Sequence, residues 1–590
     1  MYRRQAWFPR PLRYEDGGFR REWLGGVTVG VLLVPQAMAY ALLAGVDPIY
    51  GLYASLVPLL VYSLFSSCPQ VSVGPTALAS LVTLGALAGL AEPFTPQYLM
   101  LAIALAGLTG LIQLLFGLFK FGVIVTLLSR PVISGFVSAA AVLIMLSQLK
   151  TLFGIDMPRA SYLIGTLQNF FNHLSGIHWI TAAISAGSLA FLLLLRRFLP
   201  RWPGTLLLVA LATFFSFLFN WEALGVQLVG DLPRGLPQFV LPQIDAFPQT
   251  TEIPGSIQGT EGDVLGRSVW ITLLPAALIL AMLSFVETVS IAKTYEERHA
   301  YYRARPNREL IALGLSKLAG SFFQAIPTSA SFSRSAVAHR QGVTTFRAHL
   351  LTLVVVVLAL FVLTDLFAHL PLASLSVIIV LSVEKLFNLA EIKRLWHLDR
   401  KDWFSLIVTL VLTLLGGLQL GIGAGVLVSL GRVMMRSARP HLAELGCLPG
   451  TTEYRNVKRY DRLLIDPNIL VVRFDAELFF GNADYFRDEL EKLIEKRSPA
   501  PKAVVIDAHT INDLDSTGIY VLEQLHERLL SDNIALYFCG AIGPVRDQLF
   551  ASGLMDRFGR DHYFNTVQRA VSKINGDLPD AGDRPALQHS

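Results

Sequence analysis

Long apolar stretches, separated by short polar connections, fill the first three quarters of the chain. A helix needs about 20 apolar residues to cross roughly 30 Å of hydrocarbon. Stretches near that length lie at 24–43, 47–66, 98–119, 124–148, 178–199, 205–220, 269–291, 308–325, 349–369 and 402–435, the last long enough for two crossings. The pattern predicts a helical protein that crosses a membrane many times.

Three further apolar segments are shorter and begin at or just after a proline. They cover residues 75–90, 328–338 and 372–384, and with them the chain has fourteen apolar elements. Short, proline-interrupted segments at corresponding places of two halves are typical of transporters built from inverted repeats. We therefore predict a mostly α transmembrane domain at residues 24–436, preceded by a cytoplasmic segment at 1–23.

After about residue 440 the pattern becomes that of a soluble domain. Apolar runs at 469–474, 503–507 and 534–538 predict strands, and helical patterns follow them at 483–495, 516–530 and 544–552. Alternating strands and helices predict a small α/β domain. We expect this domain at residues 453–575, with a linker at 437–452 before it and a disordered tail at 576–590 after it.

Composition supports the membrane assignment and excludes other classes. The chain is 53% hydrophobic and only 16% charged, whereas soluble proteins are about 25% charged. Its net charge of +5 comes from basic residues in connections expected to be cytoplasmic, because basic residues gather on that side of a membrane. This excludes nucleic acid as a partner and places both termini in the cytoplasm.

The sequence shows no pattern for catalysis or for a cofactor. Three cysteines at unrelated spacings indicate neither disulfides nor a zinc site. We find no cluster of metal ligands, no P-loop and no nucleophile with its base. We therefore expect no enzyme activity, no cofactor and no metal.

Residues 326–337, I-P-T-S-A-S-F-S-R-S-A-V, interrupt the apolar pattern most strongly. At bilayer depth Arg334 must face protein or water, since a lipid-facing arginine costs roughly 3 kcal/mol or more. A helix that begins there also presents free backbone N–H groups and a partial positive charge. Arginine, hydroxyls and helix N-terminus together predict an anion site; a serine-rich cytoplasmic loop is the alternative.

Other polar side chains lie within predicted spans. Gln36 and Tyr40 are four residues apart, hence on one helical face, and either contribute to the site or bond to another span. Glu287 lies in L-I-L-A-M-L-S-F-V-E-T-V-S with no charged neighbour. Burial disfavours a charged carboxylate, so Glu287 is a candidate for binding and releasing a proton.

Several motifs resemble the sulfate permease (SulP) family and the STAS domain that ends its chains. The resemblance rests on V-P-Q-A-M-A-Y-A-L-L-A-G-V-D-P-I-Y-G-L-Y-A-S (34–55), E-L-I-A-L-G-L-S-K-L-A-G-S-F-F-Q (309–324), S-F-S-R-S-A-V (331–337), F-D-A-E-L-F-F-G-N-A (474–483) and I-N-D-L-D-S-T-G (511–518). It implies two inverted repeats of seven spans, arranged as core and gate domains in a dimer. It also implies that the core moves like an elevator, with two short helices whose N-termini meet at mid-membrane.

The resemblance also implies roles for individual residues. It places Gln36, Tyr40, Thr76, Ala77, Ser333 and Arg334 around the anion, with Thr76 and Ala77 contributing backbone N–H groups, and Glu287 at the position of the coupling carboxylate. Lys317 departs from the family, in which asparagine is common, and would weaken proton coupling if it pairs with Glu287. Asp515 and Thr517 match a motif that is phosphorylated in regulatory STAS proteins; in a transporter they more simply form a helix N-terminus.

The predicted function is secondary active transport of an inorganic anion across a bacterial inner membrane, with sulfate and proton symport as first choice. Bicarbonate, chloride or another anion, with sodium coupling or uncoupled exchange, stays open because one arginine and several hydroxyls do not encode anion shape. An anion channel is a further alternative, and it would not need a titrating carboxylate. A cytosolic partner of the STAS domain is also conceivable.

Overall fold

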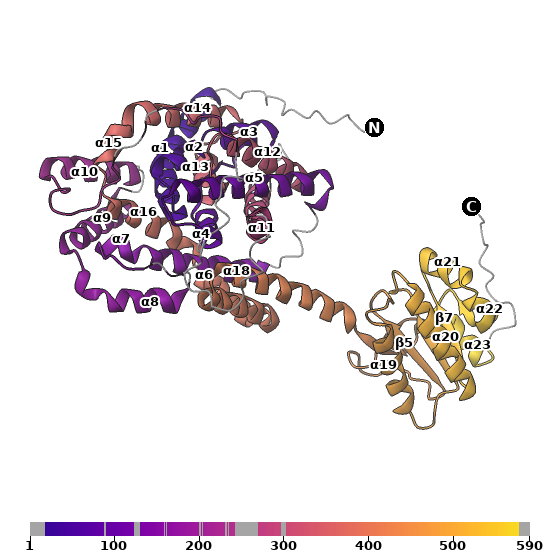
Figure 1. Ribbon diagram of the computed structural model, residues 1–590. Helices are drawn as coiled ribbons and strands as arrows, with labels where there is room; N and C mark the ends of the chain where they lie inside the picture. The colour runs from indigo at the N-terminus through magenta and orange to yellow at the C-terminus, as the bar shows by residue number, and fades with distance from the viewer. Residues whose placement is uncertain are drawn as a thin grey trace, which may run out of the picture. The chain divides into compact units, whose positions relative to one another are not determined.

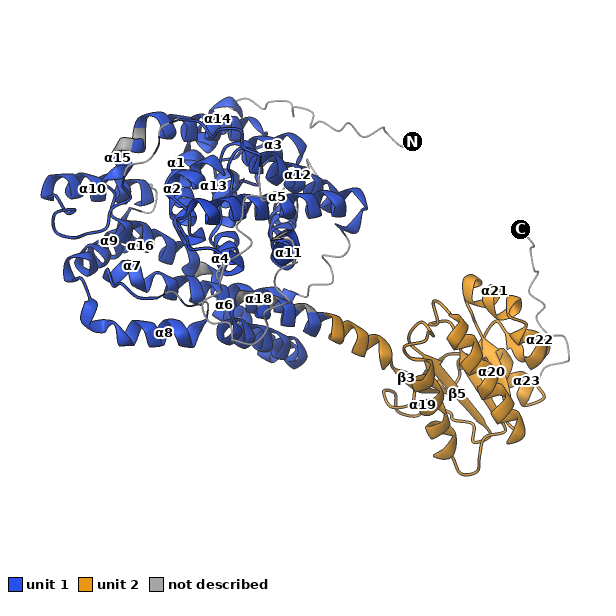
Figure 2. Cartoon of the chain, viewed as in Figure 1, with its two compact units in different colours: residues 1–429 blue, residues 430–590 orange. Residues whose placement is uncertain are grey.

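The computed structural model describes residues 18–577 except 88–89, 123–129, 159, 161, 200–201, 203, 231–232, 234, 242–268 and 297–302. The predicted N-terminal segment and tail lie largely outside the described residues. The chain divides into two compact units, residues 1–429 and 430–590, coloured separately in Figure 2, and Figure 1 labels their elements.

Unit 1 is almost entirely helical. Its first half contains α1 (Gly18–Ala44), α2 (Pro48–Tyr53), α3 (Val57–Phe65), α4 (Ala77–Leu87), α5 (Pro96–Leu118), α6 (Arg130–Ser147), α7 (Leu149–Phe153), α8 (Leu163–Asn172), α9 (Trp179–Phe198) and α10 (Gly204–Phe219). Its second half contains α11 (Val269–Glu296), α12 (Pro306–Ser321), α13 (Phe332–Arg340), α14 (Arg347–Leu358), α15 (Thr364–Ala368), α16 (Leu372–Val383), α17 (Leu389–Leu398) and α18 (Arg400–Ala438), which runs on into unit 2. Each predicted apolar element corresponds to one or more of these helices.

Six helical stretches in the described part of the chain are long and apolar enough to cross a membrane, and four more apolar helices are shorter. The stretch predicted to cross twice is interrupted at Gly417, whose φ of 81° and ψ of 176° lie outside the helical region. Glycine adopts such a positive φ without strain, because it has no Cβ. The interruption divides α18 at a point that lets the chain turn.

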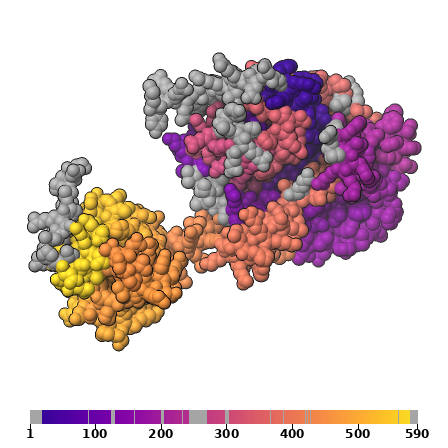
Figure 3. All heavy atoms as spheres, turned by 180° about the vertical axis from the view of Figure 1, so that it is seen from behind, coloured from indigo at the N-terminus to yellow at the C-terminus, as the bar shows by residue number. Residues whose placement is uncertain are grey.

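The two halves of unit 1 are interleaved rather than placed side by side as separate bundles. Helix α1 packs against α14, and α5 packs against α11 and α12. Indigo and salmon segments from opposite halves accordingly adjoin on the surface in Figure 3. Backbones approach closely where α5 meets α12: a Cβ on Gly110 would lie 2.8 Å from the Gly314 carbonyl oxygen. Small residues permit such crossings in membrane proteins.

Two very short strands join the halves at the centre. Val73–Gly74 (β1) pairs antiparallel with Ser329–Ala330 (β2), with Val73 opposite Ala330 and Gly74 opposite Ser329. Both strands are buried. Pairing satisfies backbone groups that lipid could not, so this irregular backbone is tolerated deep inside the protein. The strand pair fixes the starting points of α4 and α13.

Unit 2 is a six-stranded sheet with helices, as predicted. Its strand order is β4-β3-β5-β6-β7-β8, with β3 (Leu442–Cys447), β4 (Tyr454–Asn456), β5 (Ile469–Phe474), β6 (Ala503–Asp507), β7 (Ala535–Cys539) and β8 (Tyr563–Phe564). Strands β5 to β8 are parallel, and β3 is antiparallel to its neighbours. The helices are α19 (Ala483–Glu495), α20 (Ser516–Ser531), α21 (Gly543–Ala551), α22 (Leu554–Phe558) and α23 (Val567–Ile574).

The predicted strands β5, β6 and β7 and helices α19, α20 and α21 are all present, each within a residue or two of its predicted bounds. One difference concerns residues 437–452, which the sequence suggested were a linker. Strand β3 lies within them and pairs with β5. Its sequence, L-A-E-L-G-C, alternates too weakly to be recognised as a strand.

Candidate anion-binding site

Two short helices begin at the central strand pair. Helix α4 follows β1 through Pro75 and Thr76, whose hydroxyl accepts a hydrogen bond from the Ala79 N–H at 3.4 Å. Helix α13 follows β2 through Ser331, whose hydroxyl caps the Arg334 N–H at 3.4 Å. Because a helix N-terminus carries partial positive charge and free N–H groups, these two starting points favour an anion between them.

Arg334 lies at the same place and is fully buried. Its Nη1 donates to the Pro75 carbonyl oxygen at 3.1 Å and, more weakly, to Gln36 Oε1 at 3.5 Å. Its Nε and Nη2 are buried without a hydrogen-bond partner among the described residues. A Cβ on Gly74 would lie 3.3 Å from Nη2, so glycine leaves the guanidinium its space. Buried donors without acceptors are costly, and an anion would satisfy them.

The other predicted site residues lie on three elements around this guanidinium. Gln36 and Tyr40 are both buried on α1, and the Tyr40 hydroxyl bonds to Ser382 of α16. Thr76 and Ala77 are buried at the start of α4. These positions are consistent with the predicted pocket, with Gln36 in direct contact with Arg334.

Ser333 differs from the other predicted site residues. It is exposed in the first turn of α13, and its hydroxyl lies 3.1 Å from the Ser331 hydroxyl. Unlike the Arg334 guanidinium, its side chain is accessible, and it bonds to Ser331, the residue that caps the helix.

Glu287, on α11, is half-buried and accepts a hydrogen bond from the Ser329 hydroxyl of β2. The carboxylate is thus attached to the strand pair that positions both short helices. No ion pair between Glu287 and Arg334 occurs among the described residues.

Lys317, on α12, is buried and does not form an ion pair with Glu287 within 4.0 Å among the described residues. Its Nζ donates to Gln113 Oε1 at 2.7 Å and to Ser284 Oγ at 3.1 Å. Ser284 precedes Glu287 by one helical turn on α11. The lysine and the carboxylate are therefore near neighbours whose charges interact, although each has its own hydrogen-bond partners.

Glu309, at the start of α12, is a buried carboxylate that sequence reasoning missed. It accepts hydrogen bonds from the Tyr62 hydroxyl at 2.6 Å, the Ser67 N–H at 2.7 Å and the Ser67 hydroxyl at 2.5 Å. These bonds hold the segment between α3 and β1. Glu309 stands beside Arg308 in the first turn of a helix, where a surface acid is common, so the sequence carried no signal that it is buried.

In unit 2, Asp515 forms a helix N-terminus. Its Oδ1 accepts from the Gly518 N–H and its Oδ2 from the Phe480 N–H, both at 2.8 Å. Thr517 is half-buried in the first turn of α20. The geometry accounts for Asp515 as a structural cap that also holds the segment before α19.

Interleaved halves, short helices that begin at a central strand pair and a buried arginine with two donors unsatisfied among the described residues suit a membrane transporter for anions. Comparison with known proteins agrees. Residues 19–409 match the sulfate permease family and residues 462–570 match the STAS domain. The chain belongs to the sulfate permease family, as its motifs predicted, and this is a family of transporters rather than enzymes.

Relatives align over almost the whole chain. A probable sulfate transporter 4.2 of Arabidopsis thaliana is 34% identical, with 94% of this chain and 80% of the relative covered. A probable sulfate transporter of Mycobacterium tuberculosis is 31% identical, with 96% and 98% covered.

Solved structures confirm the predicted fold of inverted repeats followed by a STAS domain. The murine Solute Carrier 26 family member A9 anion transporter in the inward-facing state superposes with a TM-score of 0.86 at 24% identity, covering 96% of this chain and 92% of that one. The transmembrane domain of a cyanobacterium bicarbonate transporter, BicA, gives a TM-score of 0.57 at 22% identity, covering 71% and 99%. At these identities the likeness concerns the fold.

Proposed function

We propose that this chain takes up sulfate together with a proton, and that its core domain carries the anion by an elevator-like movement. The observation that carries the proposal is Arg334: a fully buried guanidinium with two donor atoms left without partners among the described residues. The names of the relatives, probable sulfate transporters from a plant and a bacterium, support sulfate as the anion.

The surroundings of Arg334 suit an oxyanion. Nε and Nη2 point from one edge of the guanidinium, and two parallel donors can hold two oxygens of a tetrahedral anion. Backbone N–H groups at Thr76 and Ala77 offer donors from the start of α4, since the first N–H groups of a helix have no partner within it. The Ser331 hydroxyl caps the start of α13, the helix that carries Arg334.

Glu287 supports coupling to a proton. A carboxylate inside a membrane protein is a functional candidate because its charge is costly there. Its hydrogen-bond donor among the described residues, Ser329, belongs to β2, so a proton on Glu287 changes a hydrogen bond at the strand from which the anion site begins. Protonation also offsets charge that an arriving anion brings in.

The proposed movement separates α1 and α4 from α6 and α16. Helix α1 contacts α10 and α16, and α4 contacts α6; the Tyr40–Ser382 hydrogen bond is one contact between α1 and α16. Such a single hydrogen bond, worth about 1 kcal/mol net, can be exchanged during each cycle.

Orientation and assembly complete the proposal. Basic residues in the connections around Arg130, Arg196 and Lys393 support a cytoplasmic location for that face and for both termini, in a bacterial inner membrane. The homodimer follows from the family resemblance, and mass measurement in detergent tests it.

The test is uptake of labelled sulfate by purified protein in liposomes, compared with labelled bicarbonate, with and without an inward proton gradient. We expect sulfate to accumulate only when the gradient is present. Bicarbonate uptake that ignores the proton gradient and follows sodium would overturn both the anion and the coupling ion. Sulfate flux at channel-like rates without accumulation would favour an anion channel.

A further inference from the structure

A second buried cation lies close to the proposed site. Lys317 Nζ is held by Gln113 of α5 and Ser284 of α11, and the side chain is only 2% exposed. Nothing in the proposed binding of sulfate uses it. A buried lysine in a membrane span is costly unless it has a task.

In the hydrogen-bond network, both partners of Lys317 Nζ can only accept a hydrogen bond from it. Ser284 gives its own proton to the Leu280 carbonyl oxygen at 2.6 Å. The Gln113 amide NH₂ donates to the Ala281 carbonyl oxygen and to Ser284 Oγ, both at 2.8 Å. Each partner of Nζ therefore presents an oxygen acceptor, which suits an ammonium with its three donors and no acceptor.

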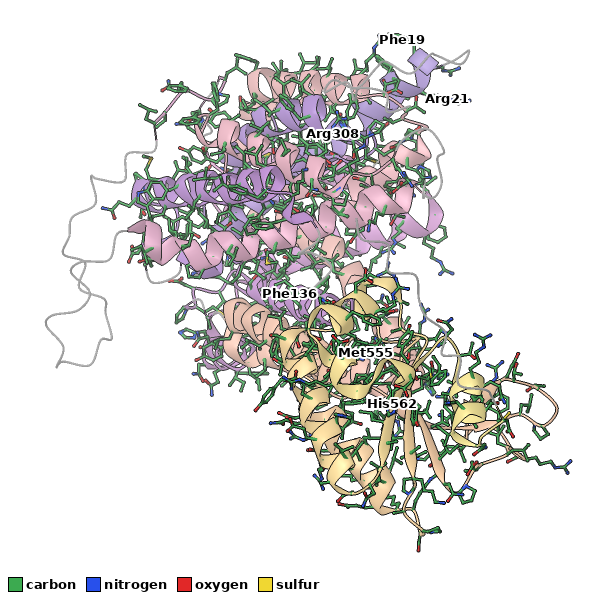
Figure 4. All side chains as sticks on the ribbon, turned by 90° about the vertical axis from the view of Figure 1, so that its right-hand side faces the viewer. Phe19, Arg21, Phe136, Arg308, Met555 and His562 are labelled. Carbon is green, nitrogen blue, oxygen red and sulfur yellow. The ribbon has the colours of Figure 1, made fainter. Side chains whose placement is uncertain are left out.

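Arg334, Lys317 and Glu287 are charged side chains in the interior of unit 1: Arg334 and Lys317 are fully or almost fully buried, and Glu287 bonds to β2. Two other buried acids of unit 1, Glu309 and Glu22, each follow an arginine in the chain, Arg308 and Arg21, which Figure 4 labels. Helices α3, α5 and α11 pack against α12; from α3 Tyr62 bonds to Glu309, and from α11 the charge of Glu287 interacts with that of Lys317. The charge that moves with the anion is therefore set by these three residues.

Their charges can be followed through a cycle. With Glu287 ionised, the empty core carries a single positive charge. Sulfate adds two negative charges and the proton on Glu287 adds one positive, so the loaded core is neutral. Without Lys317 the empty core would be neutral and the loaded core would carry a negative charge.

We propose that Lys317 is the fixed charge that makes the core neutral when it is loaded with one sulfate and one proton. The loaded core then crosses the membrane without moving charge, and the return of the empty core is the voltage-dependent step. This inference rests on the proposed function, since it takes sulfate as the anion and Glu287 as the proton site. It specifies one proton for each sulfate.

The test compares two modes of transport in liposomes at equal pH on both sides. In exchange of labelled internal sulfate for external sulfate, only the loaded core moves; in net uptake, the empty core must return. Valinomycin and potassium set membrane potentials of opposite sign. For the wild-type protein we expect exchange to change by less than about twofold between the two potentials, and net uptake to change by about fivefold or more.

Two variants at the same position sharpen the test. Lys317→Gln should make exchange depend on potential by about fivefold, because its loaded core carries a charge, whereas Lys317→Arg should behave as the wild type. Voltage-dependent sulfate exchange by the wild-type protein overturns this inference alone. Voltage-independent exchange by Lys317→Gln also overturns this inference alone.

Absence of sulfate exchange in the wild-type protein overturns the proposed function as well. If the variants do not insert, the wild-type comparison of exchange with net uptake still decides.

Discussion

Two carboxylates in the core of unit 1 face different surroundings. Glu309 receives three hydrogen bonds, from Tyr62 and from the backbone and side chain of Ser67. Glu287 receives one, from Ser329. A carboxylate held by three donors has its position locked, whereas one held by a single donor can change its position and its hydrogen bond at small cost. The arrangement at Glu309 stabilises the fold, and the arrangement at Glu287 suits a group that changes state during transport.

The two buried cations show the same contrast. Lys317 faces acceptors that are already oriented toward it, whereas Arg334 keeps two donor atoms unsatisfied among the described residues. The difference teaches that a buried charge alone does not mark a binding site. A binding site is indicated by a buried charged group with unsatisfied hydrogen-bond donors, because a ligand can supply the missing acceptors.

Arg334→Ala tests this contrast with the largest expected effect. We expect sulfate uptake to fall by at least about 100-fold, since hydrogen bonds to a charged group contribute roughly 1.5–3 kcal/mol each. Stability without sulfate should fall little, because the variant loses the bond to Pro75 but also loses a buried charge with two unsatisfied donors. Sulfate should raise the melting temperature of the wild type and leave that of the variant unchanged.

The matched control for Arg334 is Arg340→Ala, which removes an exposed arginine from the last turn of the same helix. It should retain uptake and stabilisation by sulfate. Similar uptake by the Arg334→Ala variant and the wild type would show that the anion binds elsewhere.

Glu309→Ala addresses the satisfied carboxylate. Its removal leaves Tyr62 and Ser67 with three donors and no acceptor, which should destabilise the protein by about 3 kcal/mol. Glu287→Ala makes the same change where only Ser329 loses its acceptor, and should cost about 1 kcal/mol. Thermal unfolding in detergent without sulfate compares the two. Equal losses would mean that the number of donors does not distinguish these sites.

Glu287→Gln separates transport from coupling. Glutamine keeps an oxygen for Ser329 and cannot gain or lose the proton, so exchange of internal for external sulfate should persist. Accumulation driven by a gradient of one pH unit should disappear, a loss of up to about tenfold because one pH unit corresponds to roughly 1.4 kcal/mol. Accumulation that still follows the pH gradient in this variant would place the proton on another group.

The sequence predicted the elements of this fold better than its contacts. Apolar length and proline positions were enough to locate α4, α13 and α16, and alternating patterns located β5, β6 and β7. Arg334 could be recognised because an arginine inside an apolar stretch violates a strong rule. The burial of Glu309 could not be recognised, because it depends on Tyr62 and Ser67, which are more than 240 residues away in the chain.

Individual orientations were also beyond the sequence. Ser333 and Ser331 are two residues apart in a run of hydroxyls, and only the start of α13 decides that Ser331 caps the helix while Ser333 is exposed. The sequence left open whether Lys317 forms an ion pair with Glu287. Its actual partner, Gln113, comes from a helix whose apolar pattern gave no reason to single it out.

Asp515 extends the comparison to unit 2, with the smallest effect. Both its carboxylate oxygens accept from backbone N–H groups, so it resembles Glu309 rather than Glu287, and we expect it to stabilise the start of α20. Asp515→Ala should cost about 1 kcal/mol, seen in the full chain as roughly fivefold faster amide exchange in the first turn of α20. Asp532→Ala, at the exposed other end of that helix, should not accelerate amide exchange in the first turn of α20.

The regulatory alternative predicts a different result: Thr517→Glu, which adds negative charge at the start of α20, would then alter sulfate uptake while amide exchange stays unchanged.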